Sequence, residues 1–134
     1  MVNTNGIERI NKVILDTNFL VYCARQKIDY ASQINNLISE AFELAVPEQV
    51  VNELKKLSEV AEKLKDREAS LLALKLLKHN NVKILKVEGF SENYADTAIL
   101  SIIKNNYLAT LDKQLKKKLS NVIVIEGKKK LVLA

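Results

Sequence analysis

The most constraining feature of this sequence is an unbroken apolar run, Val13, Ile14 and Leu15, that leads directly into Asp16. An apolar segment without alternation is typical of a strand buried on both faces, as in a parallel sheet covered by helices. Such sheets bind their ligands in the crevice beyond the carboxyl ends of the strands. We therefore expect Asp16 to stand at the ligand-binding edge of the sheet, on the first strand of the domain.

Strand-like and helix-like segments alternate along the rest of the chain. Further strands are predicted at 42–46, 82–87, 107–111, 122–125 and 131–133, with 82–87 at a sheet edge because its apolar residues alternate with lysines. Helices are predicted at 18–26, 30–40, 47–57, 58–79, 92–105 and 114–119, with a break near Lys65 and Asp66 and a cap at Ser91. This order predicts an α/β fold, a three-layer sandwich with a mainly parallel sheet of about five strands. The 134 residues suit one domain, 1–134.

Three more acidic residues fall where they can meet Asp16. Asp112 ends a predicted strand, and Glu53 and Asp96 lie in early turns of helices that follow strands. All four positions belong to the carboxyl edge of the predicted sheet. Simpler interpretations remain open, because Asp16 and Asp112 could each cap a helix, and Glu53 and Asp96 could be solvated helix residues.

Four carboxylates brought together repel one another, and their pKa values rise unless a cation compensates the charge. Mg²⁺ fits oxygen ligands best, and Mn²⁺ accepts the same set. A site of this kind can hydrolyse phosphodiesters, since the metal activates water and neutralises charge on the phosphate oxygens. No thiol or imidazole is required; the lone Cys23 is interpreted as a core residue and His79 as a surface residue.

The charge balance indicates a polyanionic partner. The net charge is +5 and the pI is about 9.3, which favours contacts with phosphates. Lysines gather late in the chain, at Lys113, Lys116, Lys117 and Lys118, and again at 128–130. We expect the first cluster, directly after Asp112, to hold the substrate backbone. A lysine-rich surface that serves solubility is the alternative.

Other bulk features bear on the compartment. No apolar run approaches the roughly 20 residues needed to cross a bilayer, and the polar amino terminus does not look like a secretory signal. One cysteine cannot form an intramolecular disulfide, which fits a reducing setting. We predict a cytoplasmic protein without a membrane partner.

Four short motifs carry a resemblance to a known family. They are Leu-Asp-Thr-Asn at 15–18, Val-Asn-Glu-Leu at 51–54, Tyr-Ala-Asp-Thr at 94–97 and Ala-Thr-Leu-Asp at 109–112. In this order and spacing they resemble PIN domains, a family of small metal-dependent ribonucleases, over about residues 12–125. The resemblance implies an endoribonuclease that uses Mg²⁺ or Mn²⁺ and acts on RNA.

The same resemblance implies a role for individual residues. Asp16, Glu53, Asp96 and Asp112 match the metal-binding carboxylates of the family. Asn18 and Thr110 match positions that orient ligands or water through hydrogen bonds.

Parts of these motifs are similar to the branch that processes small-subunit ribosomal RNA in archaea and eukaryotes. One position departs from that branch, where many relatives carry a second acid directly after the helix Asp and this chain has Thr97. Two alternatives stay open. One is the toxin ribonuclease of a toxin–antitoxin pair, often a homodimer that binds an antitoxin protein. The other is an RNA-binding module without activity.

Other phosphate-handling folds match less well. A haloacid dehalogenase needs a second Asp where Asn18 stands, so its general acid is missing. A response-regulator receiver needs an acidic pair before its phosphorylated Asp and a strand-end Lys later, and neither is in place. A dinucleotide-binding fold needs a glycine-rich turn after the first strand, and the three glycines lie at 6, 89 and 127.

Overall fold

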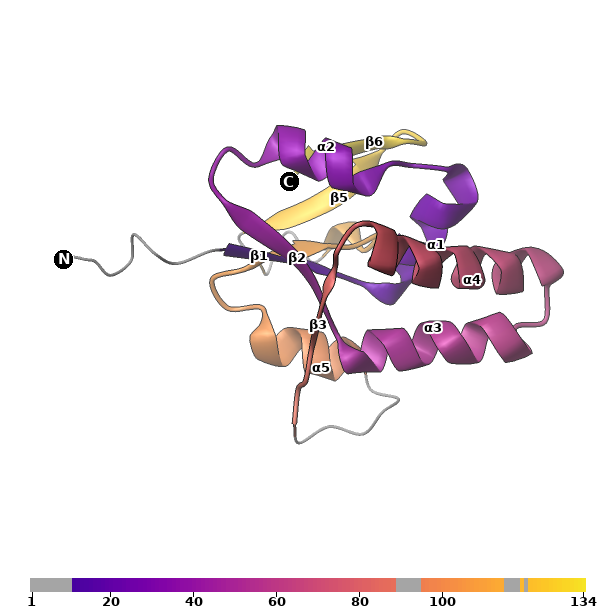
Figure 1. Cartoon of the computed structure of the whole chain (residues 1–134). Coiled ribbons are helices and arrows are strands. Elements are labelled where there is room, and N and C mark those ends of the chain that lie inside the picture. Colours follow the sequence, from indigo (N-terminus) through magenta and orange to yellow (C-terminus); the bar gives the residue numbers. More distant parts are fainter. Residues whose placement is uncertain (1–10, 89–94, 115–118, 120) are drawn as a thin grey trace.

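The computed structural model describes residues 11–88, 95–114, 119 and 121–134. Its first half contains strand β1 (Asn11–Leu15), helix α1 (Thr17–Gln26), helix α2 (Tyr30–Leu37), strand β2 (Phe42–Pro47) and helix α3 (Glu48–Val60). Its second half contains helix α4 (Leu64–His79), strand β3 (Lys83–Leu85), helix α5 (Ala95–Ile102) and strands β4 (Tyr107–Ala109), β5 (Val122–Glu126) and β6 (Lys130–Leu133). The predicted alternation of strands and helices is confirmed (Figure 1).

The strands form one six-stranded sheet in the order β3-β2-β1-β4-β5-β6. All neighbours from β3 to β5 are parallel, and β6 is antiparallel to β5. The predicted, mainly parallel sheet is therefore confirmed, with β6 as a sixth strand at one edge and β3 at the other. Strand β1 lies inside the sheet, between β2 and β4. Because these strands are parallel, the carboxyl end of β1 lies beside the carboxyl ends of its neighbours, where such sheets bind ligands.

The apolar run that predicted β1 is the centre of the core. Val13, Ile14 and Leu15 are fully buried. In Figure 1, α2 lies on one side of the sheet, and α3 and α5 lie on the other, so both faces of β1 are covered. This three-layer arrangement explains why the strand is uniformly apolar and does not alternate. It also fixes Asp16 as the first residue after the buried segment.

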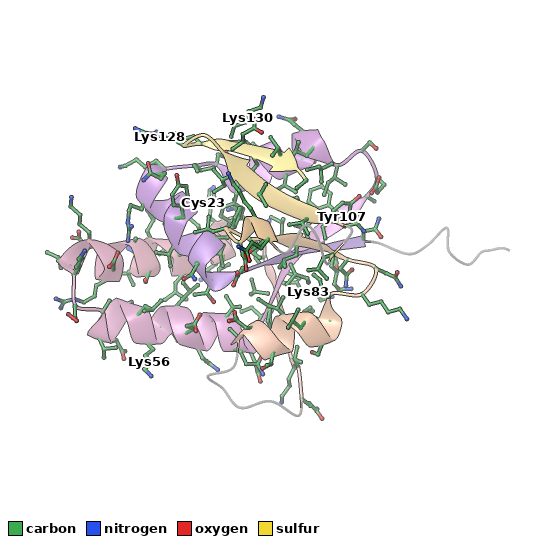
Figure 2. The ribbon with its side chains drawn as sticks, turned by 180° about the vertical axis from the view of Figure 1, so that it is seen from behind. Cys23, Lys56, Lys83, Tyr107, Lys128 and Lys130 are labelled. Atoms are coloured by element: carbon green, nitrogen blue, oxygen red, sulfur yellow. The ribbon has the colours of Figure 1, made fainter. Side chains whose placement is uncertain are left out.

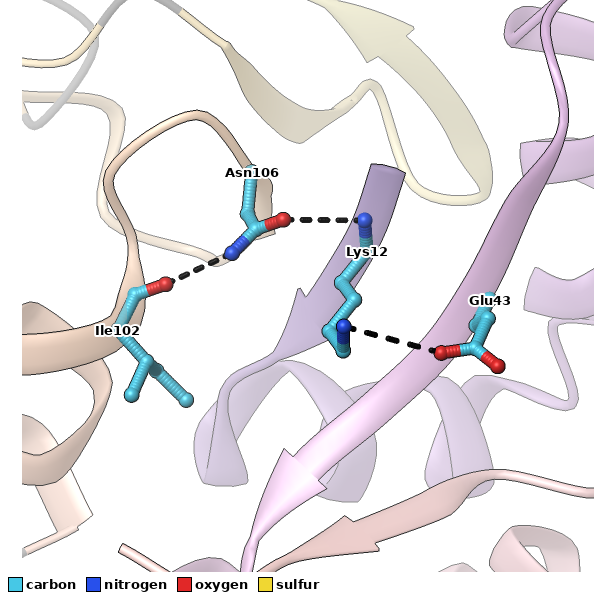
Figure 3. A network of polar contacts seen from close by, with 4 residues as sticks. All are labelled: Lys12, Glu43, Ile102 and Asn106. Carbon is cyan, nitrogen blue, oxygen red and sulfur yellow. Dashed lines mark hydrogen bonds and ion pairs between the residues drawn. The ribbon is translucent and has the colours of Figure 1, made fainter. Parts of the chain in front are cut away.

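The opposite, amino edge of the sheet is held by the side chain of Asn106 (Figure 3). Its Oδ1 accepts a hydrogen bond from the Lys12 backbone N–H at 3.0 Å, and its Nδ2 donates to the Ile102 carbonyl oxygen at 2.8 Å. The Lys12 ammonium lies 3.9 Å from Glu43 of β2. These contacts link the end of α5 to the starts of β1 and β2. Because Asn106 directly precedes β4, they also hold the start of β4 beside β1.

Several predicted boundaries were wrong. The break expected near Lys65 and Asp66 falls at 61–63, and Asp66 lies instead in the first turn of α4, where the helix dipole favours a carboxylate. The predicted helix 30–40 ends at Leu37, because Ile38 is extended. Strand β4 ends at Ala109 and not at residue 111, since its last partner on β5 is Ile123.

Other predictions fall on parts of the chain that the structure does not describe. The Ser91 cap lies outside the described residues, and so does most of the predicted helix 114–119. Within the described part, no helix is both long and apolar enough to span a membrane.

Candidate active site

Asp16 is held at the carboxyl end of β1 by its neighbours in the sheet. Its backbone N–H donates to the Ala109 carbonyl oxygen of β4 at 3.0 Å. Its Oδ2 accepts a hydrogen bond from the Thr110 hydroxyl at 2.9 Å. Asp16 precedes α1, but its side chain makes no capping hydrogen bond to that helix. The capping interpretation of Asp16 is therefore wrong, and its carboxylate faces the sheet edge.

Thr110 connects Asp16 to Asp112. The Thr110 side chain is fully buried, and its backbone N–H donates to the Ile123 carbonyl oxygen of β5 at 3.0 Å. While its hydroxyl donates to Asp16, the same oxygen accepts from the Asp112 backbone N–H at 3.2 Å. One hydroxyl thus joins the ends of β1 and β4, 94 residues apart in the sequence.

Asp112 lies beyond the end of β4, on an exposed turn. Its Oδ1 accepts a hydrogen bond from the Gln114 backbone N–H at 3.0 Å. This contact fits the capping interpretation of Asp112, because a short polar side chain that bonds two residues ahead begins a turn. The second carboxylate oxygen is in no hydrogen bond to the described residues.

Four of the predicted site residues line one pocket of about 290 Å³ at this edge of the sheet. Its polar lining comes from α1, α5 and the residues after β1 and β4. Those polar residues are Asp16, Asn18, Asp96 and Asp112. Three of the four predicted carboxylates therefore share one pocket. Glu53 is half-buried on α3 and does not line it.

The charges at this edge act most strongly on Asp16. Burial raises the pKa of the Asp16 carboxyl above its usual value, and the hydrogen bond from Thr110 partly offsets that rise. The carboxylates of Asp96 and Glu53 raise the same pKa further. Glu53 thus reaches the site through its charge, although it does not line the pocket. A cation placed here would remove the repulsion that raises the pKa.

The donor set suits a hard divalent cation, because it consists of oxygen atoms alone. Within the described residues, no three His, Cys, Asp or Glu side chains already form a group able to hold a metal. The structure thus gathers carboxylates around one pocket without closing them into a finished ligand shell. Asp16, Asp96 and Asp112 are the pocket residues that fit such an ion, and Glu53 of α3 acts on Asp16 through its charge.

Sequence reasoning missed the apolar wall of this pocket. Ile99 and Leu100 of α5 and Leu108 of β4 line it beside the carboxylates. Leu100 is 55% exposed, although it is a large apolar side chain. The signal was present in the sequence, since Ile99 and Leu100 follow Asp96 by three and four residues and share its side of a helix. The buried Thr17 hydroxyl also lies beside Asp16 in sequence and has no hydrogen-bond partner among the described residues.

The lysines predicted to hold the substrate are only partly described. Lys113 is exposed in a short turn directly after Asp112, as expected. Lys116, Lys117 and Lys118 lie outside the described residues. Their role therefore stays a prediction.

A second, larger pocket of about 490 Å³ lies between α1, α2 and α4, away from the carboxylates. Cys23 lines it, and burial raises the pKa of its thiol to about 12. A thiol with such a pKa stays protonated near neutral pH and is a poor nucleophile. The interpretation of Cys23 as a core residue is confirmed, and His79 is exposed as predicted. Of these two pockets, the smaller one is lined by several of the predicted carboxylates.

Comparison with known proteins agrees with this geometry. A family model described as a PIN like domain matches residues 13–130. Ribonuclease VapC4 of Methanocaldococcus jannaschii is 35% identical over 125 residues, which cover 88% of this chain and 92% of that protein. The chain belongs to the PIN domain ribonuclease family.

Solved structures place this PIN domain in the same fold. The PIN domain endonuclease Utp24 matches with a TM-score of 0.69 and 25% identity, over 91% of this chain and 90% of that one. VapBC2 from Rickettsia felis, solved bound to a DNA fragment from its promoter, matches with a TM-score of 0.54 and 14% identity, over 83% of this chain and 96% of that one. The second likeness shows the fold alone.

Proposed function

We propose that this PIN domain is a divalent-metal-dependent endoribonuclease. It hydrolyses RNA phosphodiester bonds with Mg²⁺ or Mn²⁺ bound by Asp16, Glu53, Asp96 and Asp112. The observation that carries the proposal is the pocket at the carboxyl edge of the parallel sheet, which gathers Asp16, Asp96 and Asp112. VapC4 is named a ribonuclease and Utp24 an endonuclease, which supports the same activity here.

The chain's own residues have separable tasks in this proposal. A bound divalent cation supplies an activated water and neutralises charge on the phosphate. Asp16, Asp96 and Asp112 would hold the ion from the lining of the pocket, and Glu53 would complete the ligand set from α3. Thr110 fixes the Asp16 carboxylate and the Asp112 backbone through one hydroxyl. Asn18 lines the pocket where its amide can orient water or substrate.

Phosphate contacts complete the proposed site. Lys113 is exposed directly after Asp112, where its ammonium can bind the RNA backbone. Lys116, Lys117 and Lys118 are proposed for the same task from the sequence. No side chain in this set acts as a covalent nucleophile, so hydrolysis proceeds by water.

Two cellular roles fit this activity. Ribosomal RNA processing is favoured by the motifs around Asp16, Asp96 and Asp112 that are similar to that branch. A toxin role, with an antitoxin protein as partner, is favoured by the match to VapC4 along 92% of that protein. Growth arrest on expression of the wild type, relieved by Asp16→Asn, would assign the toxin role. Accumulation of an unprocessed ribosomal RNA precursor without the protein would assign the processing role.

Metal dependence is the direct test of the reaction. We expect the protein to cleave a labelled, structured RNA in Mn²⁺ or Mg²⁺, to stop in excess EDTA and to resume when Mn²⁺ is restored. The reason is that negatively charged carboxylates cannot neutralise the phosphate, and a bound cation would both do so and lower the pKa of a bound water. Gel analysis of the products gives the measurement. Cleavage that persists in EDTA would contradict the proposal, and tight RNA binding with no cleavage in Mn²⁺ would favour the inactive RNA-binding module.

A further inference from the structure

The turn between β5 and β6 carries consecutive lysines at the same edge of the sheet as Asp16. Strands β1, β4 and β5 are parallel, so the residues after β5 lie at the carboxyl edge. The Tyr22 hydroxyl of α1 donates to the Lys128 carbonyl oxygen at 2.8 Å. Tyr22 follows Asp16 by six residues, about 9 Å along the axis of α1. The turn therefore lies at the same edge of the sheet as the pocket and does not line it.

The backbone of this turn is fixed from two helices. Besides the contact from Tyr22, the Gln33 amide of α2 donates to the Lys129 carbonyl oxygen at 2.9 Å. The Gln33 Oε1 accepts from the Leu131 backbone N–H at 2.8 Å, so one side chain binds both the turn and the edge strand β6. Gly127 supplies the left-handed conformation, φ 67°, at which the chain reverses. A turn fixed in this way loses less conformational freedom when its side chains bind a ligand.

The lysine ammonium groups on this turn are available to a partner. Lys128, Lys129 and Lys130 are all exposed, and none is in an ion pair within the described residues. Lys130 lies across from Glu126 in the β5–β6 ladder, which reduces its local positive charge. Lys128 and Lys129 have no such cross-strand carboxylate. Figure 2 shows Lys128 and Lys130 at the hairpin, apart from Lys83 on β3.

We propose that Lys128 and Lys129 form a phosphate-binding platform for the RNA strand next to the bond that is cut. This inference rests on the proposed ribonuclease function and extends its substrate contacts to a second element. The pocket binds the scissile phosphate, and the turn binds phosphates of neighbouring nucleotides. Three observations point to a nucleic-acid strand as the partner. The backbone of the turn is held by two helices, its lysine ammonium groups are exposed, and the turn lies at the same edge of the sheet as Asp16.

Salt-dependent binding of RNA tests this platform. Fluorescence anisotropy follows a labelled single-stranded RNA titrated with the Asp16→Asn protein in EDTA, so that binding is read without cleavage. Each phosphate contact to a single strand contributes about 0.7 to the slope of log K against log salt. We expect the double variant Lys128→Gln with Lys129→Gln to reduce the magnitude of that slope by about 1.4. The affinity for RNA in 0.1 M salt should fall by about 10- to 30-fold.

A matched variant controls for net charge. Lys83→Gln with Lys104→Gln removes the same charge from two exposed positions, the first residue of β3 and the turn before β4, on the opposite edge of the sheet. We expect that variant to change affinity by no more than about twofold, because contacts beyond a Debye length are screened. Equal losses in the two double variants, or no loss from the first, would overturn the platform. Cleavage by the wild type in Mn²⁺ is scored separately, so failure of the nuclease proposal is recognised independently.

Discussion

Replacing Asp16 with asparagine is expected to abolish RNA cleavage while the fold keeps or gains stability. Asp16 stands at the end of the central strand and is the carboxylate on which burial and two acidic neighbours act together. Removing its charge removes a proposed metal ligand and also relieves the repulsion from Asp96 and Glu53. Cleavage of labelled RNA in Mn²⁺ and the melting temperature without metal are the two measurements.

The stability difference should depend on pH in a defined direction. The pKa of Asp16 is raised in the folded state, so folding favours its protonated form. The destabilising effect of the charge is therefore absent below the carboxyl's ordinary value of 3.8 and grows as pH rises through the raised pKa. We expect Asp16→Asn to gain most over the wild type near neutral pH and little at pH 3.

The matched control for this variant is Asp29→Asn. Asp29 caps α2 by accepting from the Ser32 backbone N–H at 3.2 Å, and asparagine caps helices about equally well. This variant should cleave RNA as the wild type does. Asp112→Asn should lose activity together with Asp16→Asn. Equal cleavage by all four proteins would mean a contaminating nuclease or a wrong site.

Replacing Thr110 with valine is expected to lower metal affinity or cleavage about 10- to 100-fold, the usual effect of removing a hydrogen bond that orients a metal ligand. Valine keeps the shape of the buried side chain but removes the hydroxyl that binds Asp16 and the Asp112 backbone. The free energy of unfolding should fall by about 1–3 kcal/mol, because a partly buried carboxylate and a backbone N–H lose their partner.

Serine at position 110 separates the role of the hydroxyl from packing. Thr110→Ser keeps the donor and acceptor and loses one methyl group, so activity should return to within a few-fold of the wild type. Apparent Mn²⁺ affinity, taken from the metal dependence of cleavage, distinguishes ligand positioning from a loss of fold. Valine and serine variants with the same Mn²⁺ dependence would show that the hydroxyl does not position Asp16.

The sequence alone predicted that Asp16 lies at the carboxyl end of β1, because a strand buried on both faces has an unbroken run of apolar residues. A strand between two helical layers must be apolar throughout, and the first charged residue then marks where the sheet ends. The edge position of 82–87 was equally readable, since its lysines alternate with apolar residues. Patterns of burial are thus recoverable from a single sequence.

Features that depend on tertiary hydrogen bonds were not recoverable in the same way. The end of β4 at Ala109 and the turn at Asp112 depend on Thr110 and on the partners that β5 provides. The separation of Glu53 from the pocket depends on how α3 packs, which its helical spacing does not reveal. The anchoring of the β5–β6 turn by Tyr22 and Gln33 joins residues about a hundred positions apart.

In the proposed site, carboxylates from distant segments of the chain bind a divalent cation at this edge of the sheet. Anomalous scattering from crystals grown with Mn²⁺ tests this binding directly, because the signal locates the ion without assumptions about activity. We predict a Mn²⁺ peak in the pocket lined by Asp16, Asp96 and Asp112, with carboxylate oxygens at about 2.1 Å. Crystals of RNA-cleaving protein with no Mn²⁺ in that pocket, or with the ion bound elsewhere, would contradict it.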